Sequence, residues 1–245
     1  MANFTLILKE HKIVADGTDF YAFVKPADFT FEAGQYVAMM VSHLVAPDNR
    51  AGVRSLSISS APYEEHLHFT MRTGESGFKQ TMAALKPGDT VAVTKAIGHF
   101  TLSQAADGLP IVFLVGGIGI TPVRSILKQA AHEENERSFT VLYSNRFVKD
   151  ATFHEELKNV KLKNFQYVTT LSQDTMPCSG GNEERGYICE SMVRKYVSDV
   201  QGVWFYIVGG PAFVEAMEKM LSDMGVTKER QVSDPFTGLT GAPKK

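Results

Sequence analysis

Cysteine is scarce in this sequence. The only two cysteines in 245 residues, Cys178 and Cys189, lack the short Cys-x-x-Cys spacing of a zinc site. Iron–sulfur clusters usually take four cysteine ligands, so the chain alone is not expected to carry one. The seven histidines include no pair at metal-ligand spacing on a predicted helix, and we predict no metal site. So few cysteines also fit a reducing cytosol.

Long apolar runs are also missing. The longest, residues 110–123, has about 14 residues and contains three glycines, whereas a membrane span needs roughly 20 apolar residues. The apolar N-terminal stretch ends at Lys9 and Glu10, before it reaches the length of a signal peptide. We therefore predict a cytoplasmic enzyme or subunit with no membrane span.

The sequence also has no large excess of positive or negative charge. The formal net charge is −2, so nothing in the composition favours a polyanion, and we predict no nucleic-acid partner. Local basic clusters remain able to bind an acidic partner.

The first half of the chain is a series of short β-like runs separated by turn residues. Several short strands at regular spacing are typical of a sandwich or a barrel. One helix is predicted at residues 78–85, before the stop at Pro87 and Gly88. The expected strands are residues 4–9, 18–25, 35–41, 53–59, 67–73 and 90–95.

The second half alternates strands with helices, after a linker at residues 103–110. An unbroken apolar run at 111–115 indicates a strand buried on both faces. Strand–helix alternation predicts a parallel sheet with helices on both faces. Further strands are expected at 139–143, 165–171 and 204–208, and helices at 123–132, 151–159, 191–197 and 212–224, with 174–184 as a surface loop.

A glycine-rich segment, residues 116–122, follows the buried strand and precedes a helix. Its glycines let the backbone approach a bulky ligand, and free N–H groups at a helix start favour a pyrophosphate. Thr121 is expected as the N-cap and Pro122 as the first helical residue. The alternative is a tight turn that binds no ligand.

Three other segments carry candidate chemistry. Residues 54–62 contain alternating Arg54, Leu56 and Ile58, which on their own indicate an ordinary half-buried strand. Residues 72–79 combine glycines at a helix start with Arg72 and Lys79, which suits either a phosphate site or a solvated turn. Residues 206–212 end a second buried strand in glycines, and two such strand ends can form opposite walls of a ligand crevice.

Taken in order, these segments resemble the ferredoxin–NADP reductase superfamily. Its pattern has Arg-x-Tyr-Ser in a barrel, a Gly/Ser helix start, Gly-Gly-x-Gly-x-x-Pro after a strand, and Cys-Gly-Pro near the end. The resemblance covers almost the whole chain. It implies an N-terminal antiparallel Greek-key β-barrel that binds flavin, residues 1–104, and a Rossmann-like parallel-sheet domain that binds NAD(P), residues 105–245.

The resemblance also implies roles for individual residues. Ser57 and Thr121 would lie beside the reacting atoms, with Ser57 near flavin N5 and Thr121 near the nicotinamide. The implied flavin-binding residues are Arg54, Ser55, Leu56, Ser57, Met71, Arg72, Thr73, Ser76, Gly77, Phe78, Lys79 and Phe236. The implied nucleotide-binding residues are Gly117, Ile118, Gly119, Thr121, Pro122, Ser144, Asn145, Arg146, Gly209, Gly210 and Pro211.

Several positions depart from the family pattern. Leu56 replaces the tyrosine that would stack on the flavin, and Val208 replaces the cysteine near the hydride path. Asp234 is shorter than the usual glutamate, and Leu239 stands where an aromatic residue is expected after the closing glycine. These departures leave the rate of turnover open.

The function implied is a flavin-dependent NAD(P)H oxidoreductase that passes electrons to a separate acceptor, such as a ferredoxin or an oxygenase component. Two alternatives stay open: a reductase of free flavin, quinone or ferric complexes, and a regulatory or electron-transfer subunit with little activity of its own. FAD is favoured over FMN because residues 76–79 suit a pyrophosphate. Arg146 favours NADPH over NADH, since its guanidinium can pair with a 2′-phosphate.

Overall fold

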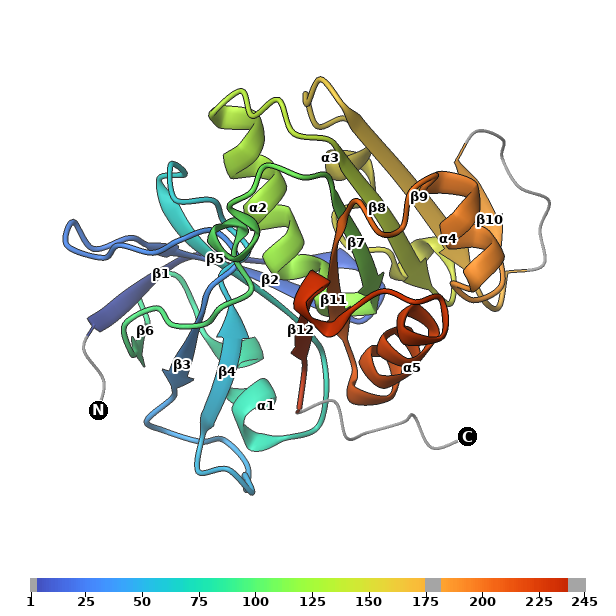
Figure 1. The fold of residues 1–245 in the computed structure, drawn as a ribbon. Coiled ribbons are helices and arrows are strands. Elements are labelled where there is room, and N and C mark those ends of the chain that lie inside the picture. Colours follow the sequence, from blue (N-terminus) through green and yellow to red (C-terminus); the bar gives the residue numbers. More distant parts are fainter. Residues whose placement is uncertain (1–3, 175–181, 238–245) are drawn as a thin grey trace. The chain divides into compact units, whose positions relative to one another are not determined.

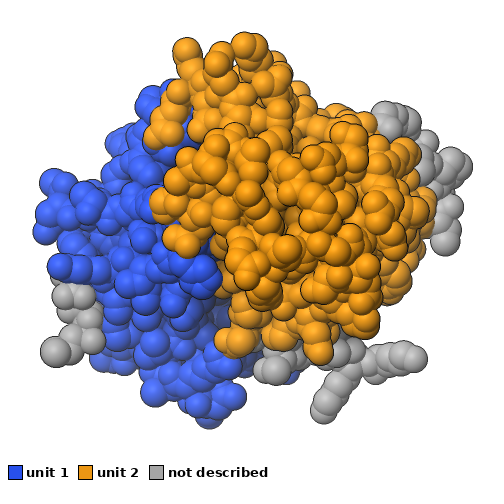
Figure 2. All heavy atoms as spheres, in the orientation of Figure 1, with its two compact units in different colours: residues 1–101, 121–132 blue, residues 102–120, 133–245 orange. Residues whose placement is uncertain are grey.

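The computed structural model describes residues 4–174 and 182–237 (Figure 1). The chain divides into two compact units, coloured separately in Figure 2. Unit 1 comprises residues 1–101 and 121–132, and unit 2 comprises residues 102–120 and 133–245. A helix in the middle of the sequence is thus grouped with the N-terminal strands.

Unit 1 is built on a six-stranded antiparallel sheet in the order β4-β3-β6-β1-β2-β5. A bridge between Ile58, just beyond β4, and Phe69 of β5 joins the two edge strands, so the sheet closes as the predicted barrel. The elements are β1 (Phe4–Ala15), β2 (Thr18–Val24), β3 (Tyr36–Met40), β4 (Val53–Ser57), β5 (His66–Arg72), β6 (Thr90–Val93) and helix α1 (Gly77–Ala84).

The barrel interior is filled by alternate residues of its strands, as strand geometry requires. Leu6 and Leu8 of β1, Val37 and Met39 of β3, and Phe69 of β5 are almost completely buried. Phe78 and Met82 of α1 belong to the same core and are fully buried. Helix α1 is therefore held against the barrel by its apolar face, and its N-terminus is fixed beside β4.

Helix α2 (Ile120–His132) joins unit 1 through buried polar contacts. Arg124 donates to the Ser59 carbonyl at 2.7 Å and forms an ion pair with Glu64 at 2.9 Å. The Ser125 hydroxyl donates to the Ser60 carbonyl at 2.6 Å. Together these bonds satisfy backbone carbonyls where the chain leaves β4.

Unit 2 contains a six-stranded sheet, all parallel, in the order β10-β9-β8-β7-β11-β12, which confirms the predicted parallel architecture. The strands are β7 (Ile111–Gly116), β8 (Phe139–Asn145), β9 (Phe165–Leu171), β10 (Glu183–Arg185), β11 (Trp204–Gly209) and β12 (Gln231–Pro235). The helices are α3 (His154–Lys158), α4 (Glu190–Tyr196) and α5 (Pro211–Asp223), with single 3-10 turns at Leu102–Ala105, Gly117–Gly119, Val148–Asp150 and Lys228–Arg230.

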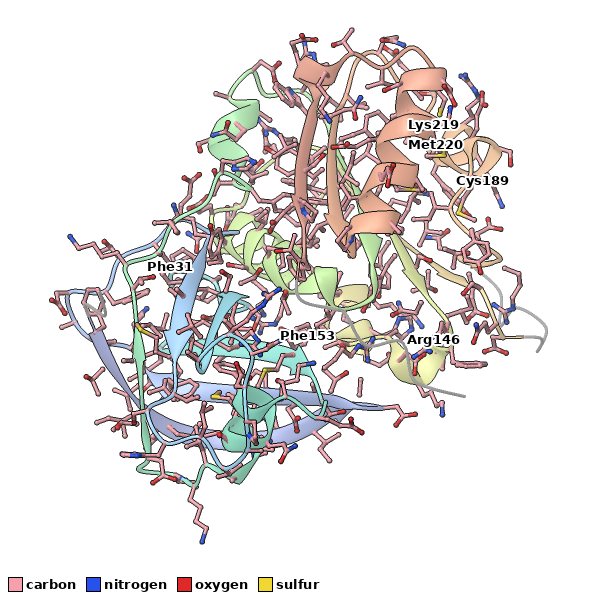
Figure 3. All side chains as sticks on the ribbon, turned by 90° about the horizontal axis from the view of Figure 1, so that it is seen from below. Phe31, Arg146, Phe153, Cys189, Lys219 and Met220 are labelled. Atoms are coloured by element: carbon pink, nitrogen blue, oxygen red, sulfur yellow. The ribbon has the colours of Figure 1, made fainter. Side chains whose placement is uncertain are left out.

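One face of this sheet packs against α4 and α5. Leu114, Leu142 and Ile207 from the strands meet Val193 of α4 and Leu221 of α5, all of them fully buried. Met217 and Met224 belong to this core and Met220 packs on it, so the methionines of α5 and its C-cap are packing residues. Figure 3 shows Met220 and its neighbour Lys219 on α5.

Two sequence predictions in unit 2 need correction. Glu183 and Glu184, expected in a surface loop, form β10 and pair with Thr169 and Thr170 of β9. The helix expected at 151–159 is only α3, because Phe153 has a left-handed backbone (φ 60°) that interrupts the helical path before it. The rest of the expected loop, residues 175–181, lies outside the described residues, and so does Cys178.

None of the helices in the described part of the chain is both long and apolar enough to cross a bilayer.

Candidate functional site

Arg54 of β4 is held by the loop that precedes the strand. Its Nη1 donates to Asp48 Oδ1 at 2.9 Å, and its Nη2 donates to Asp48 Oδ2 at 2.7 Å. The guanidinium also lies over the Phe78 ring, 5.4 Å from the ring centroid. Only 12 % of the Arg54 side chain is exposed, and the Asp48 side chain is fully buried.

The first amides of α1 bind the same loop. The Gly77 N–H donates to the Pro47 carbonyl at 3.1 Å, and the Phe78 N–H donates to Asp48 Oδ2 at 2.9 Å. A Cβ at Gly77 would lie 2.1 Å from the Ala46 carbonyl oxygen, so glycine is required for this close approach. Ser76 is the N-cap, and its hydroxyl accepts from the Lys79 N–H. The glycine at the helix start thus admits a loop of the protein itself.

Three cationic side chains gather beside this helix start. Burial, and then the positive charges of Arg54 and Arg72, hold the pKa of Lys79 below its ordinary value, although the negative charge of Asp19 acts against them. The Lys79 Nζ donates to the Thr73 carbonyl at 3.3 Å, and Arg72 donates to the Thr18 hydroxyl at 2.6 Å. Repulsion within this cluster would be relieved by a dianionic group, so these residues fit the phosphates of a flavin nucleotide.

The other predicted flavin residues lie along β4 and β5. Leu56 packs on the barrel core from its edge, Ser55 is exposed and Ser57 is buried. Met71 is part of the barrel core, with only 6 % of its surface exposed, and Thr73 is exposed. Leu56 offers an aliphatic surface and no ring, so a flavin lying there would be held by packing without aromatic stacking.

The glycine-rich segment of unit 2 begins at the end of β7. Gly116 ends the strand, Gly117 has φ 51°, and residues Gly117–Gly119 make one 3-10 turn that leads into α2. Because this turn carries the helical path upstream, α2 begins at Ile120, so the predicted N-cap role of Thr121 is wrong. Thr121 and Pro122 lie in the first turn, where a missing proline N–H costs no helical bond.

Gly119 is the tightest point of this segment. A Cβ there would lie 2.7 Å from the Val208 carbonyl oxygen and 3.0 Å from the Gly209 nitrogen. The turn therefore packs directly on the end of β11, so the two glycine segments predicted from the sequence, residues 116–122 and 206–212, do meet. This is the crevice position at the carboxyl ends of parallel strands, where ligands of such sheets bind.

Phe213, in the first turn of α5, was missed by the sequence reasoning. A Cβ at Gly116 or at Gly209 would lie 2.9 Å from its ring, so both strand ends are glycine because this ring lies over them. The signal available in the sequence was a glycine at the end of each of these two strands. Gly210 caps α5, and Pro211 is its first residue.

The end of β8 carries the predicted adenosine-side residues. Ser144 and Asn145 are the last residues of β8, and Arg146 extends from the strand end with 57 % of its side chain exposed (Figure 3). The Asn145 side chain is buried, and its amide makes no hydrogen bond to any described residue. Its position and its chemistry suit a polar ligand. Arg146 Nε lies 3.7 Å from Asp150 Oδ2, a loose pair that leaves most of the guanidinium available.

The C-terminal part of the predicted site is only partly described. The Phe236 N–H donates to the Gly209 carbonyl at 2.8 Å, which places Phe236 beside the end of β11. Val208 is fully buried, and its backbone pairs with that of Asp234 in β12. Leu239 and the closing glycine lie outside the described residues. Over the described parts, no group of three or more metal-ligating side chains comes together.

Comparison with known proteins first shows which sequences this chain is similar to. Residues 113–219 match the family described as oxidoreductase NAD-binding domain. Flavohemoprotein A of Dictyostelium discoideum is 26 % identical over 235 residues, covering 89 % of this chain and 56 % of the relative. The reductase component of propane 2-monooxygenase of Rhodococcus jostii is 27 % identical over 220 residues, covering 87 % of this chain and 58 % of the relative. The chain thus spans little more than half the length of these relatives.

Comparison with solved structures then shows the fold. A crystal structure of a ferredoxin NADP+ reductase from Neisseria gonorrhoeae, with bound FAD and NADP, superposes with a TM-score of 0.80 at 19 % identity. The match covers 95 % of this chain and 98 % of that one. The chain therefore has the two-domain fold of that reductase, which is the fold that the resemblance in its sequence implied.

Proposed function

We propose that the chain is a flavin-dependent NAD(P)H oxidoreductase that passes electrons to a separate acceptor, such as a ferredoxin or an oxygenase component. The observation that carries this proposal is the cation cluster of Arg54, Arg72 and Lys79 beside the start of α1. The NAD-binding family match of residues 113–219 supports binding of the reduced nucleotide that donates the hydride. We keep residues 1–104 as the flavin domain and residues 105–245 as the nucleotide domain.

Arg54, Arg72 and Lys79 would hold the flavin phosphates in this proposal, and FAD is favoured over FMN because three cations suit a diphosphate. When bound, the flavin accepts a hydride from the reduced nicotinamide and can release electrons singly or in a pair. Leu56 would support the ring by packing, and the Ser57 hydroxyl would donate a hydrogen bond near N5. The protein's contribution is binding, orientation and electrostatics.

The ends of β7, β8 and β11 would hold the nicotinamide nucleotide. The turn Gly117–Gly119 and Gly209 bring backbone close to the ligand, Thr121 would lie near the nicotinamide, and Asn145 would bind a polar edge of the adenosine. Hydride transfer depends mainly on placing the reacting atoms, a proximity effect. No titrating acid or base is needed from the chain.

The proposal is tested by measuring flavin binding and then the reduction of the bound flavin. Purified protein mixed with FAD, FMN or riboflavin should bind FAD most tightly, which quenching of flavin fluorescence measures. NADH or NADPH added without oxygen should then bleach the bound flavin. Protein that binds flavin but bleaches no faster than free flavin would favour a regulatory subunit, which the replacements at Leu56 and Val208 motivate. Fast turnover with small acceptors alone would favour a reductase of free flavin or quinones.

Arg146→Ala is expected to weaken the use of NADPH selectively. If Arg146 pairs with the 2′-phosphate, its loss should raise the apparent KM for NADPH about 5- to 10-fold, in line with an exposed charge-assisted bond. The KM for NADH should change by less than about twofold, since NADH has no 2′-phosphate. Arg194→Ala removes a similarly exposed arginine of unit 2 and serves as the control. Equal changes for both nucleotides would contradict the assignment.

A further inference from the structure

The donors of Arg54 are used unequally. A guanidinium has five N–H groups in a fixed plane. In Arg54, one N–H of Nη1 donates to Asp48 Oδ1 and the other donates to the Val53 carbonyl at 2.7 Å. One N–H of Nη2 donates to Asp48 Oδ2. Nε and the second N–H of Nη2 form no hydrogen bond within the described residues. These two N–H groups are parallel and lie on the same edge of the plane, the fork that binds two oxygens of one phosphate.

We propose that Asp48 is a positioning residue for phosphate recognition: by binding the end of the Arg54 guanidinium, it presents the Nε/Nη2 edge to a phosphate of the flavin. This inference rests on the proposed function and deepens it. Asp48 itself would not touch the ligand, because its side chain is fully buried and both of its oxygens are occupied by donors of the protein.

The structure gives Asp48 the rigidity that this role needs. Its Oδ1 also accepts the backbone N–H of Arg50 at 2.9 Å and of Gly52 at 3.2 Å, and its Oδ2 accepts the Phe78 N–H. The Arg54 hydrogen bonds hold the pKa of Asp48 well below its ordinary value, and the three backbone bonds add to this effect. The carboxylate is therefore charged throughout the working pH range.

The Phe78 ring also restricts the orientation of the Arg54 guanidinium. It lies beneath the guanidinium plane and is fully buried in the barrel core. Asp48 at one edge and Phe78 on one face leave the arginine little freedom to turn, so little entropy is lost when a phosphate binds. Positioning of this kind selects flavins that carry a phosphate, and has no effect on the flavin ring itself.

The decisive experiment compares riboflavin, FMN and FAD, because only the last two carry phosphate. In Asp48→Asn, dissociation constants for FMN and FAD should rise at least about tenfold, in line with the loss of a well-oriented charge-assisted pair, while that for riboflavin changes less than about twofold. Glu65→Gln neutralises a carboxylate of unit 1 that is 89 % exposed, and should leave all three constants unchanged. Circular dichroism and thermal melting confirm that each variant is folded.

Arg54→Lys tests the same idea from the other side of the pair, with Asp48 itself kept. Lysine keeps the positive charge but lacks the fork, so affinity for FMN and FAD should fall as in Asp48→Asn, with riboflavin again unaffected. In the double variant the two losses of binding free energy for FMN and FAD should not add, because both substitutions act on the Nε/Nη2 edge of Arg54.

Three outcomes would overturn the inference. The first is an equal loss for riboflavin and FAD in Asp48→Asn, which would show a general structural role. The second is Arg54→Lys binding FAD as tightly as the unchanged protein, and the third is fully additive losses in the double variant. If the unchanged protein bound no flavin of any kind, the proposed function would fail, and the inference with it.

Discussion

Replacing Arg124 with methionine is expected to lower the free energy of unfolding by about 3–5 kcal/mol, the usual cost of leaving one charge of a buried pair without its partner. Arg124 is 5 % exposed, and its Nη1 and Nη2 bind the two carboxylate oxygens of Glu64 at 2.9 and 3.1 Å. Methionine fills a similar volume, so the loss reports the ion pair and the hydrogen bond to the Ser59 carbonyl rather than a cavity. Chemical denaturation followed by fluorescence or circular dichroism measures it.

The cost of this substitution should depend on pH. Burial alone would raise the pKa of Glu64, but the hydrogen bond and the charge of Arg124 outweigh it and hold the pKa below its ordinary value. A carboxylate with a lowered folded pKa stabilises the protein above its unfolded pKa, and this stability is lost as the pH falls through the folded pKa. In Arg124→Met, burial is opposed only by the Ala61 hydrogen bond and the charge of His68, so acid should protonate Glu64 more readily. The difference in free energy of unfolding between the variant and the unchanged protein should therefore narrow as the pH falls.

The controls separate charge from packing. Glu64→Gln combined with Arg124→Met removes both charges, and should recover part of the stability lost in Arg124→Met alone. Lys163→Met, which removes a surface partner of Glu136, should change stability by less than about 1 kcal/mol. A difference in free energy of unfolding between Arg124→Met and the unchanged protein that stays constant from about pH 4 to pH 7 would contradict the ion-pair account.

Gly119→Ala is expected to disrupt both the fold of unit 2 and nucleotide binding. The new Cβ would meet the Val208 carbonyl oxygen at 2.7 Å and its carbon at 2.9 Å, and backbone atoms of a central strand cannot move aside cheaply. We expect a loss of about 2–3 kcal/mol in stability, typical of overpacking. Because the turn Gly117–Gly119 would be displaced from the end of β11, the apparent affinity for NADH and NADPH should fall at least about tenfold.

Gly108→Ala provides the matched comparison for Gly119→Ala. Gly108 has φ 77°, and a Cβ at this residue would meet no atom of the described residues within 4 Å, so only backbone strain is introduced, which costs roughly 1 kcal/mol. Nucleotide affinity should be unchanged in that variant. Titration calorimetry with each nucleotide measures the binding, and equal affinities for Gly119→Ala and the unchanged protein would show that the turn is not part of the nucleotide site.

Periodicity and motif order predicted most of the fold. The apolar run at 111–115 and the repeated short runs before it were enough to separate a parallel sheet from a barrel, because burial on two faces and on one face leave different patterns. Strand β10 was missed because Glu183 and Arg185 carry no apolar pattern; an edge strand of three residues is held by backbone pairing with β9. The shortening of the 151–159 helix was missed because nothing in Phe153 predicts a left-handed backbone.

The candidate site was predicted less completely than the fold. Arg54 and Lys79 could be named because the family pattern places cations there, but Asp48 could not, since it lies six residues before Arg54 in a loop with no motif. Gly77 looked like a glycine for a ligand, yet it admits the backbone of Ala46 and Pro47. Contacts between a loop and a helix start depend on the closed barrel, and no local pattern of residues encodes them.

The most direct test of the central claim is a single turnover between the two cofactors. FAD-loaded protein is mixed without oxygen with NADPH or NADH, each with hydrogen or deuterium at nicotinamide C4, and the flavin absorbance is followed by stopped flow. The account predicts rapid bleaching by at least one nucleotide and slower bleaching by its C4-deuterated form. Bleaching no faster than that of free FAD with both nucleotides, in protein shown to bind flavin and nucleotide, would contradict it.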